Sequence, residues 1–187
     1  MKAEAKREGA KRIGARLAAA ALALAAATAA PAQATAQQST NRVEAFRDWS
    51  VFTADAGGPV CWIVTQPQSS VAKRDGRPVQ VQRGDIYLTV AVRPRQGVDS
   101  EIAMVAGYPF RDGSTVTAEI GSRKFELFTE GENAWTYPND DGDILTAMKA
   151  GAAIVMTGVS SRGTTTIDRF SLLGFTDALT SAQNRCK

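Results

Sequence analysis

Apolar and polar side chains alternate along short segments of the chain, and turn residues separate these segments. The clearest case is residues 85–93, where Ile86, Leu88, Val90 and Val92 share one parity. Alternation with a period of two predicts a strand with one face against the core. Comparable segments lie at residues 46–53, 60–66, 102–106, 115–120, 124–129, 135–137, 152–159 and 164–173. We therefore expect a mainly β fold, a single-domain antiparallel β-sandwich of about 8–10 short strands.

Local patterns add detail to this expectation. Residues 115–120 and 124–129 are expected to pair as a hairpin, with Phe125 and Leu127 facing inward. Residues 152–159 are apolar on both faces, which indicates a central strand. Residues 67–84 are polar, and we expect an irregular excursion there, with a turn at residues 74–78.

One internal segment has helical periodicity. Residues 141–150 begin with acidic side chains, which suit the positive end of a helix dipole, and Ile144, Leu145 and Met148 form an apolar stripe. Gly151 follows, and we expect it to end this short helix in the left-handed conformation.

A C-terminal helix is expected to begin where Thr176 can cap it. The chain has two cysteines, Cys61 and Cys186, and the second lies on this helix. The helix turns Cys186 toward a sheet that could present Cys61. An exported chain meets an oxidising compartment, so we expect a disulfide that pins the last helix to the second strand. Two free thiols or a redox pair are the alternative. The apolar stripe of this helix consists of Ala178, Leu179, Ala182 and Cys186.

The first 34 residues have the order of a secretory signal peptide: a basic segment, an apolar run and small residues. The apolar run at residues 17–30, about 14 residues, is short for a hydrocarbon core of ~30 Å. We expect cleavage after Ala34 or Ala36, disorder over residues 35–42 and a folded domain over residues 43–187. The protein would be periplasmic, outer-membrane-associated or secreted, with no transmembrane anchor after cleavage. An uncleaved amphipathic or transmembrane helix is the alternative.

The charge balance changes once this segment is removed. The chain has 22 basic and 19 acidic residues, of which 6 and 2 lie in the first 36 positions, so 16 and 17 remain. The remaining net charge, about −1, gives no support for binding to nucleic acid or to an anionic membrane.

The sequence contains no histidine, which removes the usual general base near neutral pH and the commonest zinc ligand. Hydrolases that use Ser-His-Asp or Cys-His are thereby excluded. Ser70 and Lys73 have the spacing of an S-x-x-K motif, but they lie in the polar excursion, and the chain lacks S-D-N and K-T-G partners. We expect no catalytic residue and no cofactor.

Asp140, Asp141 and Asp143 are the candidate metal ligands, because calcium prefers hard oxygen donors. Their spacing differs from that of an EF-hand loop, and a turn followed by a helix start explains the same residues.

Two further groups are candidates for interaction. Residues 83–85 spell the adhesion tripeptide Arg-Gly-Asp, although Asp85 is expected to open a strand and the preceding glycine to supply a turn into it. Trp49, Trp62 and Trp135 could stack on carbohydrate or could be ordinary core and rim residues.

Residues 160–175 gather hydroxyls, an aspartate and an arginine around large apolar side chains. Neither parity of this stretch places a nucleophile beside a base, so a structural strand is favoured over a reactive site. Arg162 and Asp168, which we expect to pair across a turn or strand, join Trp135 as candidate interaction residues. One parity consists of Thr164, Thr166, Asp168, Phe170 and Leu172.

A family resemblance adds to these patterns. The segments that carry it occur in order: DWSV at 48–51, CWIVTQP at 61–67, RGD at 83–85, RP at 93–94, GYPF at 107–110, FELF at 125–128, AW at 134–135, AMKAG at 147–151, SRGT at 161–164, SLLGF at 171–175 and Cys186. This succession resembles the invasion-associated locus B (IalB) family of exported bacterial proteins. The resemblance implies a link to host-cell invasion in some intracellular pathogens, and it supplies no catalytic motif. Some members hold additional cysteines near the first tryptophan; Phe52 and Thr53 stand there in this chain, so one bridge is implied. Arg162 and Asp168 match family-pattern positions that have no established role.

The expected function is that of an exported non-enzymatic envelope protein that acts by surface binding. Its partner would be another envelope component or, in a host-associated bacterium, a host-cell surface. Two alternatives stay open: a carboxylate- or metal-dependent hydrolase using Asp140, Asp141 and Asp143, and a small-ligand carrier, which would need an apolar cavity of several hundred Å3.

Overall fold

The structure is a computed structural model that describes residues 41–187. The expected signal peptide and its cleavage sites, and most of the segment expected to be disordered, lie outside the described residues. The first strand begins at Arg42, so the expectation of disorder is wrong for that residue. Within residues 41–187, no helix is long and apolar enough to cross a bilayer.

Within the described residues, twelve strands form one hydrogen-bonded sheet in the order β1-β2-β3-β6-β7-β10-β9-β8-β11-β12-β4-β5. All neighbouring pairs are antiparallel, which confirms the predicted mainly β class. Three of the twelve, β1, β4 and β5, were not predicted. The elements are β1 (Arg42–Phe46), β2 (Trp49–Asp55), β3 (Pro59–Thr65), β4 (Pro67–Arg74), β5 (Arg77–Pro78), β6 (Tyr87–Arg93), a 3-10 turn η1 (Pro94–Gln96), β7 (Val98–Val105), β8 (Thr115–Ile120), β9 (Arg123–Glu130), β10 (Asn133–Thr136), α1 (Asp141–Ala150), β11 (Ala153–Val159), β12 (Thr165–Ser171) and α2 (Phe175–Arg185).

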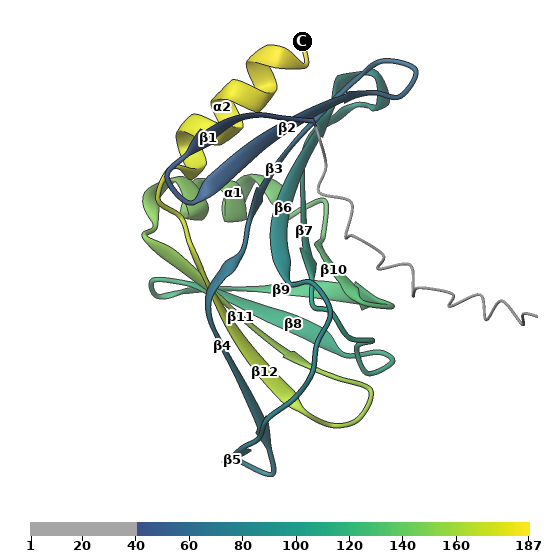
Figure 1. The fold of residues 1–187 in the computed structure, drawn as a ribbon, viewed down its shortest axis with the longest axis vertical. Coiled ribbons are helices and arrows are strands. Elements are labelled where there is room, and N and C mark those ends of the chain that lie inside the picture. Colours follow the sequence, from purple (N-terminus) through teal and green to yellow (C-terminus); the bar gives the residue numbers. More distant parts are fainter. Residues whose placement is uncertain (1–40) are drawn as a thin grey trace, which may run out of the picture. The chain divides into compact units, whose positions relative to one another are not determined.

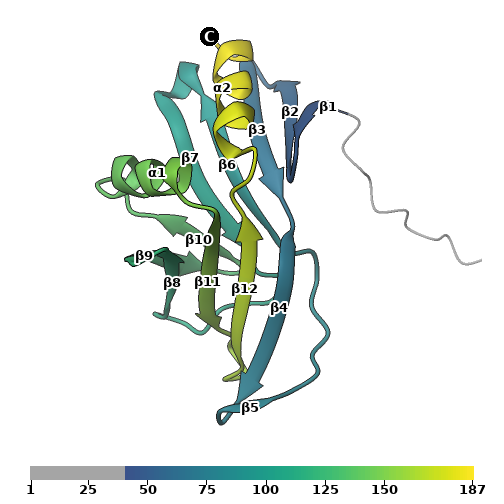
Figure 2. The same cartoon turned by 90° about the vertical axis from the view of Figure 1, so that its left-hand side faces the viewer.

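The sheet folds over on itself through β3 and β4, which are separated by a single residue, Gln66. Strand β3 pairs with β2 and β6, whereas β4 pairs with β12 and β5. The chain therefore passes from one layer into the other, as strands do at the corner of a sandwich. Figure 2 shows β3 running into β4 along one side of the domain.

Strand β4 corrects the expectation of an irregular excursion over residues 67–84. Gln68, Ser69 and Ser70 are all exposed, so the segment shows no row of inward apolar side chains. It becomes a strand because its backbone pairs with β12. The expected turn at residues 74–78 is confirmed, with positive φ angles of 50° at Asp75 and 76° at Gly76.

The inward parities of the core strands match the predictions. Leu88 and Val90 of β6 are fully buried, and the β8–β9 hairpin buries Val116 and Leu127, while Phe125 is half-buried against the core. Alternate positions therefore fill one continuous core between the layers.

Helix α1 has the predicted bounds, and it buries Ile144 and Met148. The expectation that Gly151 adopts the left-handed conformation is wrong, because its φ of −86° and ψ of 159° are extended. Close packing explains the glycine instead. An added Cβ would lie 2.6 Å from the Cγ2 atom of Ile120.

Helix α2 packs against β2 and β3 (Figure 1). It buries its predicted stripe, and the predicted disulfide joins Cys186 to Cys61 of β3, with the two Cα atoms 5.9 Å apart. The expectation that Thr176 caps this helix is wrong. Gly174, with φ of 88°, precedes the first helical residue, and Thr176 lies inside the first turn.

Candidate functional site

The inward face of β12 is polar over half of its length. Thr166 and Asp168 of this strand are buried, as is Thr164 just before it, and Asp168 is 0% exposed. A buried carboxylate lowers stability unless a partner compensates the lost hydration. Asp168 therefore requires a partner that supplies positive charge or hydrogen-bond donors.

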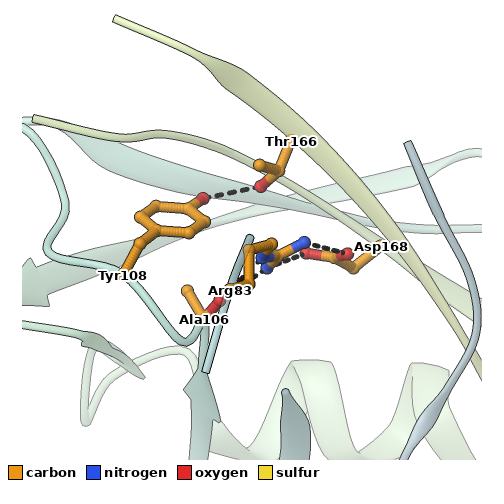
Figure 3. A network of polar contacts seen from close by, with 5 residues as sticks. All are labelled: Arg83, Ala106, Tyr108, Thr166 and Asp168. Carbon is orange, nitrogen blue, oxygen red and sulfur yellow. Dashed lines mark hydrogen bonds and ion pairs between the residues drawn. The ribbon is translucent and has the colours of Figure 1, made fainter. Parts of the chain in front are cut away.

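The partner is Arg83, from the loop that leads into β6 (Figure 3). Its Nη1 and Nη2 atoms donate to the two carboxylate oxygens of Asp168 at 2.7 and 2.8 Å. Its Nε and Nη2 atoms also donate to the carbonyl oxygen of Ala106, at 2.9 and 2.7 Å. The expected pair of Arg162 with Asp168 is wrong, because Asp168 points inward while Arg162 lies exposed in the turn between β11 and β12.

Tyr108 extends this cluster. Its hydroxyl lies 2.6 Å from the Thr166 Oγ1 atom, and the guanidinium carbon of Arg83 lies 4.9 Å from the centre of its ring. Burial raises the pKa of Tyr108, and the Thr166 hydrogen bond and the Arg83 charge partly oppose that rise. The phenol therefore stays neutral well into the alkaline range and can act as a hydrogen-bond donor or acceptor.

The Arg-Gly-Asp tripeptide is hydrogen-bonded to the rest of the domain. The donors of Arg83 face the interior, and the backbone nitrogen of Gly84 donates to the Gly107 carbonyl oxygen at 2.9 Å. Asp85 does not open the strand, contrary to expectation, because β6 begins at Tyr87. The tripeptide thus anchors the loop to the domain and leaves its arginine unavailable to an adhesion partner.

A hollow of about 460 Å3 lies beside the cluster, and we call it the arginine pocket. Three arginines reach it from three segments: Arg74 ends β4, Arg83 lies in the loop before β6, and Arg162 lies in the β11–β12 turn. Its remaining lining residues are Gln80, Val81, Gln82, Tyr108, Pro109, Ser160, Ser161, Thr164 and Thr166.

A second hollow, of about 630 Å3, contains Trp135, and we call it the aromatic groove. Trp135 of β10 stacks on Phe128 of β9 with ring centres 5.6 Å apart, and Tyr137 lies 5.3 Å from Phe128. Phe128 is 36% exposed and Tyr137 41% exposed. The groove is lined by residues 97–101, Phe128, Glu130, Trp135, Thr136, Pro138 and Asp141.

Comparison with family models gives a match over residues 49–183 to the family described as "Invasion associated locus B (IalB) protein". The chain belongs to the IalB family. The match extends from the first strand of the core to the last helix, and it confirms the resemblance read from the sequence.

A solved structure agrees with this assignment at the level of the fold. The crystal structure of invasion associated protein b from Bartonella henselae is 16% identical to this IalB chain, with a TM-score of 0.52. The likeness covers 74% of this chain and 94% of the Bartonella chain. None of the curated proteins compared with the chain matches it.

The three aspartates proposed as metal ligands take separate roles in this IalB domain. Asp141 accepts a hydrogen bond from Thr136, and Asp143 lies 3.6 Å from the Nη2 atom of Arg123. Asp140 precedes the first residue of α1. Among the described residues, no three acidic or cysteine side chains gather as a metal site would require.

The S-x-x-K pair does not form a dyad. Ser70 and Lys73 both lie on β4, and residues three apart on a strand point to opposite faces.

The three tryptophans also separate. Trp49 is fully buried in the core, and Trp62 stacks on Phe52 of the neighbouring strand β2.

Sequence reasoning missed Tyr108, Arg74 and the roles of Arg83 and Phe128. Phe128 had a usable signal, because it is a large aromatic residue at the outward parity beside the inward Leu127. Arg83 gave none, since its partner Asp168 lies 85 positions away.

Proposed function

We propose that this IalB-family chain is an exported, non-enzymatic binding protein of the cell envelope, and that it docks a partner protein in the aromatic groove. The partner is an envelope protein or a host-cell surface protein that presents basic side chains around an apolar anchor. Export rests on the basic and apolar N-terminal segment, and the envelope location follows from it.

The observation that carries this proposal is the outward aromatic cluster of Phe128, Trp135 and Tyr137, in which Phe128 and Tyr137 are exposed and Trp135 is half-buried. Aromatic side chains are enriched at the energetically dominant centres of protein interfaces. A stack of this kind on an outward sheet face offers a rigid surface for an apolar anchor, with little side-chain entropy to lose on binding.

Charge selects the partner. The lining of the groove includes Asp99, Glu101, Glu130 and Asp141, and it includes no lysine or arginine. Glu101 is paired with Arg93 at 2.7 Å, whereas the other three make no ion pair within the described part of the chain. A basic segment would complement this rim and would be steered toward it.

The test is capture from envelope and host-membrane extracts after mild cross-linking, with the purified protein in its oxidised form. Trp135→Ala should reduce the captured partner by at least about tenfold, because an interface hot spot contributes about 2 kcal/mol or more. Glu130→Lys, an exposed charge reversal, should also reduce capture, and added salt should weaken it.

Val71→Ala is the matched control, because Val71 is 43% exposed on β4, in the other layer. It should capture the partner as the unmodified protein does. Equal capture by the Trp135→Ala, Glu130→Lys and Val71→Ala proteins would contradict the proposal. It would also be contradicted if neither extract yielded a captured protein above background.

A further inference from the structure

The arginine pocket is walled by segments that are distant in sequence. The end of β4 supplies Arg74, and the tight turn at residues 160–164 supplies two serines and Arg162. Residues 80–83 form a third wall, with Tyr108 and Thr166 at the base beside the buried Arg83–Asp168 pair. The pocket thus joins three backbone segments over a rigid ion pair.

Several hydroxyl groups of the pocket keep a proton that no hydrogen bond within the described residues uses. The Oγ1 atom of Thr164 accepts from the Nη2 atom of Arg74 at 2.8 Å, and the Oγ atom of Ser160 accepts from the Thr164 backbone nitrogen at 3.1 Å. Tyr108 and Thr166 share one hydrogen bond between two hydroxyls, so one of their two protons is left over. In residues 41–187, none of these remaining hydroxyl protons has an acceptor.

The pocket also carries uncompensated positive charge. The carboxylate of Asp168 neutralises the charge of Arg83, but Arg74 and Arg162 make no ion pair in the described structure. No aspartate or glutamate lines the pocket. A site with spare donors and excess guanidinium charge requires a ligand that supplies acceptors and negative charge.

We propose that the arginine pocket binds a small hydroxyl-bearing anion, a sugar phosphate or a sugar carboxylate. Arg74 and Arg162 hold the anionic group, the hydroxyls at the base donate to ligand oxygens, and the amides of Gln80 and Gln82 contact ligand hydroxyls. The volume of about 460 Å3 suits a ligand of one or two sugar units.

Calorimetric titration of the oxidised protein tests this with four probes: glucose 6-phosphate, glucuronate, inorganic phosphate and glucose. At least one of the two sugar anions should bind at least about tenfold more tightly than glucose, and added salt should weaken it. Binding of glucose 6-phosphate with competition by inorganic phosphate identifies a phosphate site, and preference for glucuronate identifies a carboxylate site.

Arg74→Gln and Arg162→Gln should each weaken that binding by about five- to tenfold. Arg95→Gln is the matched control, because Arg95 is an exposed arginine that donates to the Gly57 carbonyl oxygen outside the pocket. It should bind as the unmodified protein does. Trp135→Ala should also leave the titration unchanged, so that failure of the groove and failure of the pocket are separable.

Three outcomes would overturn the inference. One is the absence of binding by both sugar anions up to about 10 mM. Another is equal affinity for glucose and for the anions. The third is a loss of affinity in the Arg95→Gln protein as large as that in the two pocket variants.

Discussion

Arg83 and Asp168 form an ion pair whose side chains are 8% and 0% exposed. Removing two charges from water opposes folding, and only close geometry with further hydrogen bonds offsets that penalty. Both conditions hold here, since the pair is bidentate and the guanidinium also donates to Ala106. The pair therefore fixes the loop before β6 against the inner face of β12.

Breaking this pair on one side should be strongly destabilising. Asp168→Leu leaves the Arg83 guanidinium buried without its counter-charge, and it should lower the free energy of unfolding by about 3–5 kcal/mol in urea titrations. The double variant Arg83→Met with Asp168→Leu should recover most of that loss, because an apolar pair removes both charges. A single variant as stable as the unmodified protein would contradict this assignment.

Gly107 is a second residue with a specific requirement. Its φ is 69°, and an added Cβ would lie 2.6 Å from the Gly84 carbonyl oxygen. Gly107→Ala should destabilise by about 3 kcal/mol or more, since backbone strain and a clash combine. Gly113 is the control, with φ of 68° and open space around its Cβ position, and its alanine variant should lose only about 1 kcal/mol. Equal losses would show that the Gly84 contact is unimportant.

We expect the stability of the fold to depend on pH in the alkaline range because of Tyr108. Its pKa is raised above 10.0, mainly by burial, so the folded state holds the phenolic proton more tightly than the unfolded state does. The resulting stability is present below pH 10.0 and is lost as the pH rises through the folded pKa. Tyrosinate absorbance should show a late-titrating component that disappears in Tyr108→Phe. An absorbance titration whose alkaline end is unchanged in Tyr108→Phe would contradict this.

At the scale of the element, α2 is held to the sheet by packing and by a covalent bond. Phe175 meets Trp49 edge to face at 5.1 Å, and Cys186 at the far end is bonded to Cys61. The indole nitrogen of Trp49 donates to the Ser171 carbonyl oxygen at 3.0 Å, which fixes the chain just before the helix. Both ends of α2 are thereby attached to the β2–β3 pair.

Removal of the disulfide should weaken this attachment. The bond closes a separation of 125 residues, and the double variant Cys61→Ala with Cys186→Ala should lose about 2–5 kcal/mol of unfolding free energy. Hydrogen exchange should quicken most in the last turns of α2, while the β8–β9 hairpin keeps its protection. Uniform loss of protection across the domain would show that α2 does not act as a separate element.

Sequence patterns correctly predicted the elements whose apolar spacing lies within one segment. Helix α1, the β8–β9 hairpin and the buried stripe of α2 each follow from the spacing of apolar residues within one segment. Strand β4 could not be predicted in this way, because it has no row of inward apolar side chains and its strand conformation depends on pairing with β12. The error at Gly151 has a similar origin, since contact with Ile120 from another strand requires that glycine.

At the scale of the whole molecule, both candidate sites depend on long-range placement. Arg74 and Thr164 are 90 positions apart, yet they share a hydrogen bond because β4 pairs with β12. The aromatic groove likewise requires β7, β10 and β9 to be neighbours. Sequence patterns identified Trp135, Arg162 and Asp168 as individual residues, but the strand order decides which of them meet.

The two sites have opposite charge. Carboxylates and aromatic rings line the groove, whereas arginines and hydroxyls line the pocket. Residues 37–187 contain 16 basic and 17 acidic side chains, and this near balance conceals the division. One domain therefore has an acidic aromatic groove and a separate basic pocket, which we propose bind a basic protein segment and a small anion.

Site-specific photo-crosslinking in intact bacteria and on host membranes tests whether a partner protein docks on the aromatic groove. A benzophenone amino acid replaces Phe128 in one protein and the control residue Val71 in another. We expect a discrete protein adduct from position 128 that is missing from position 71 and that disappears when Glu130→Lys is added. The same adducts from both positions, or none from position 128 in either setting, would contradict it.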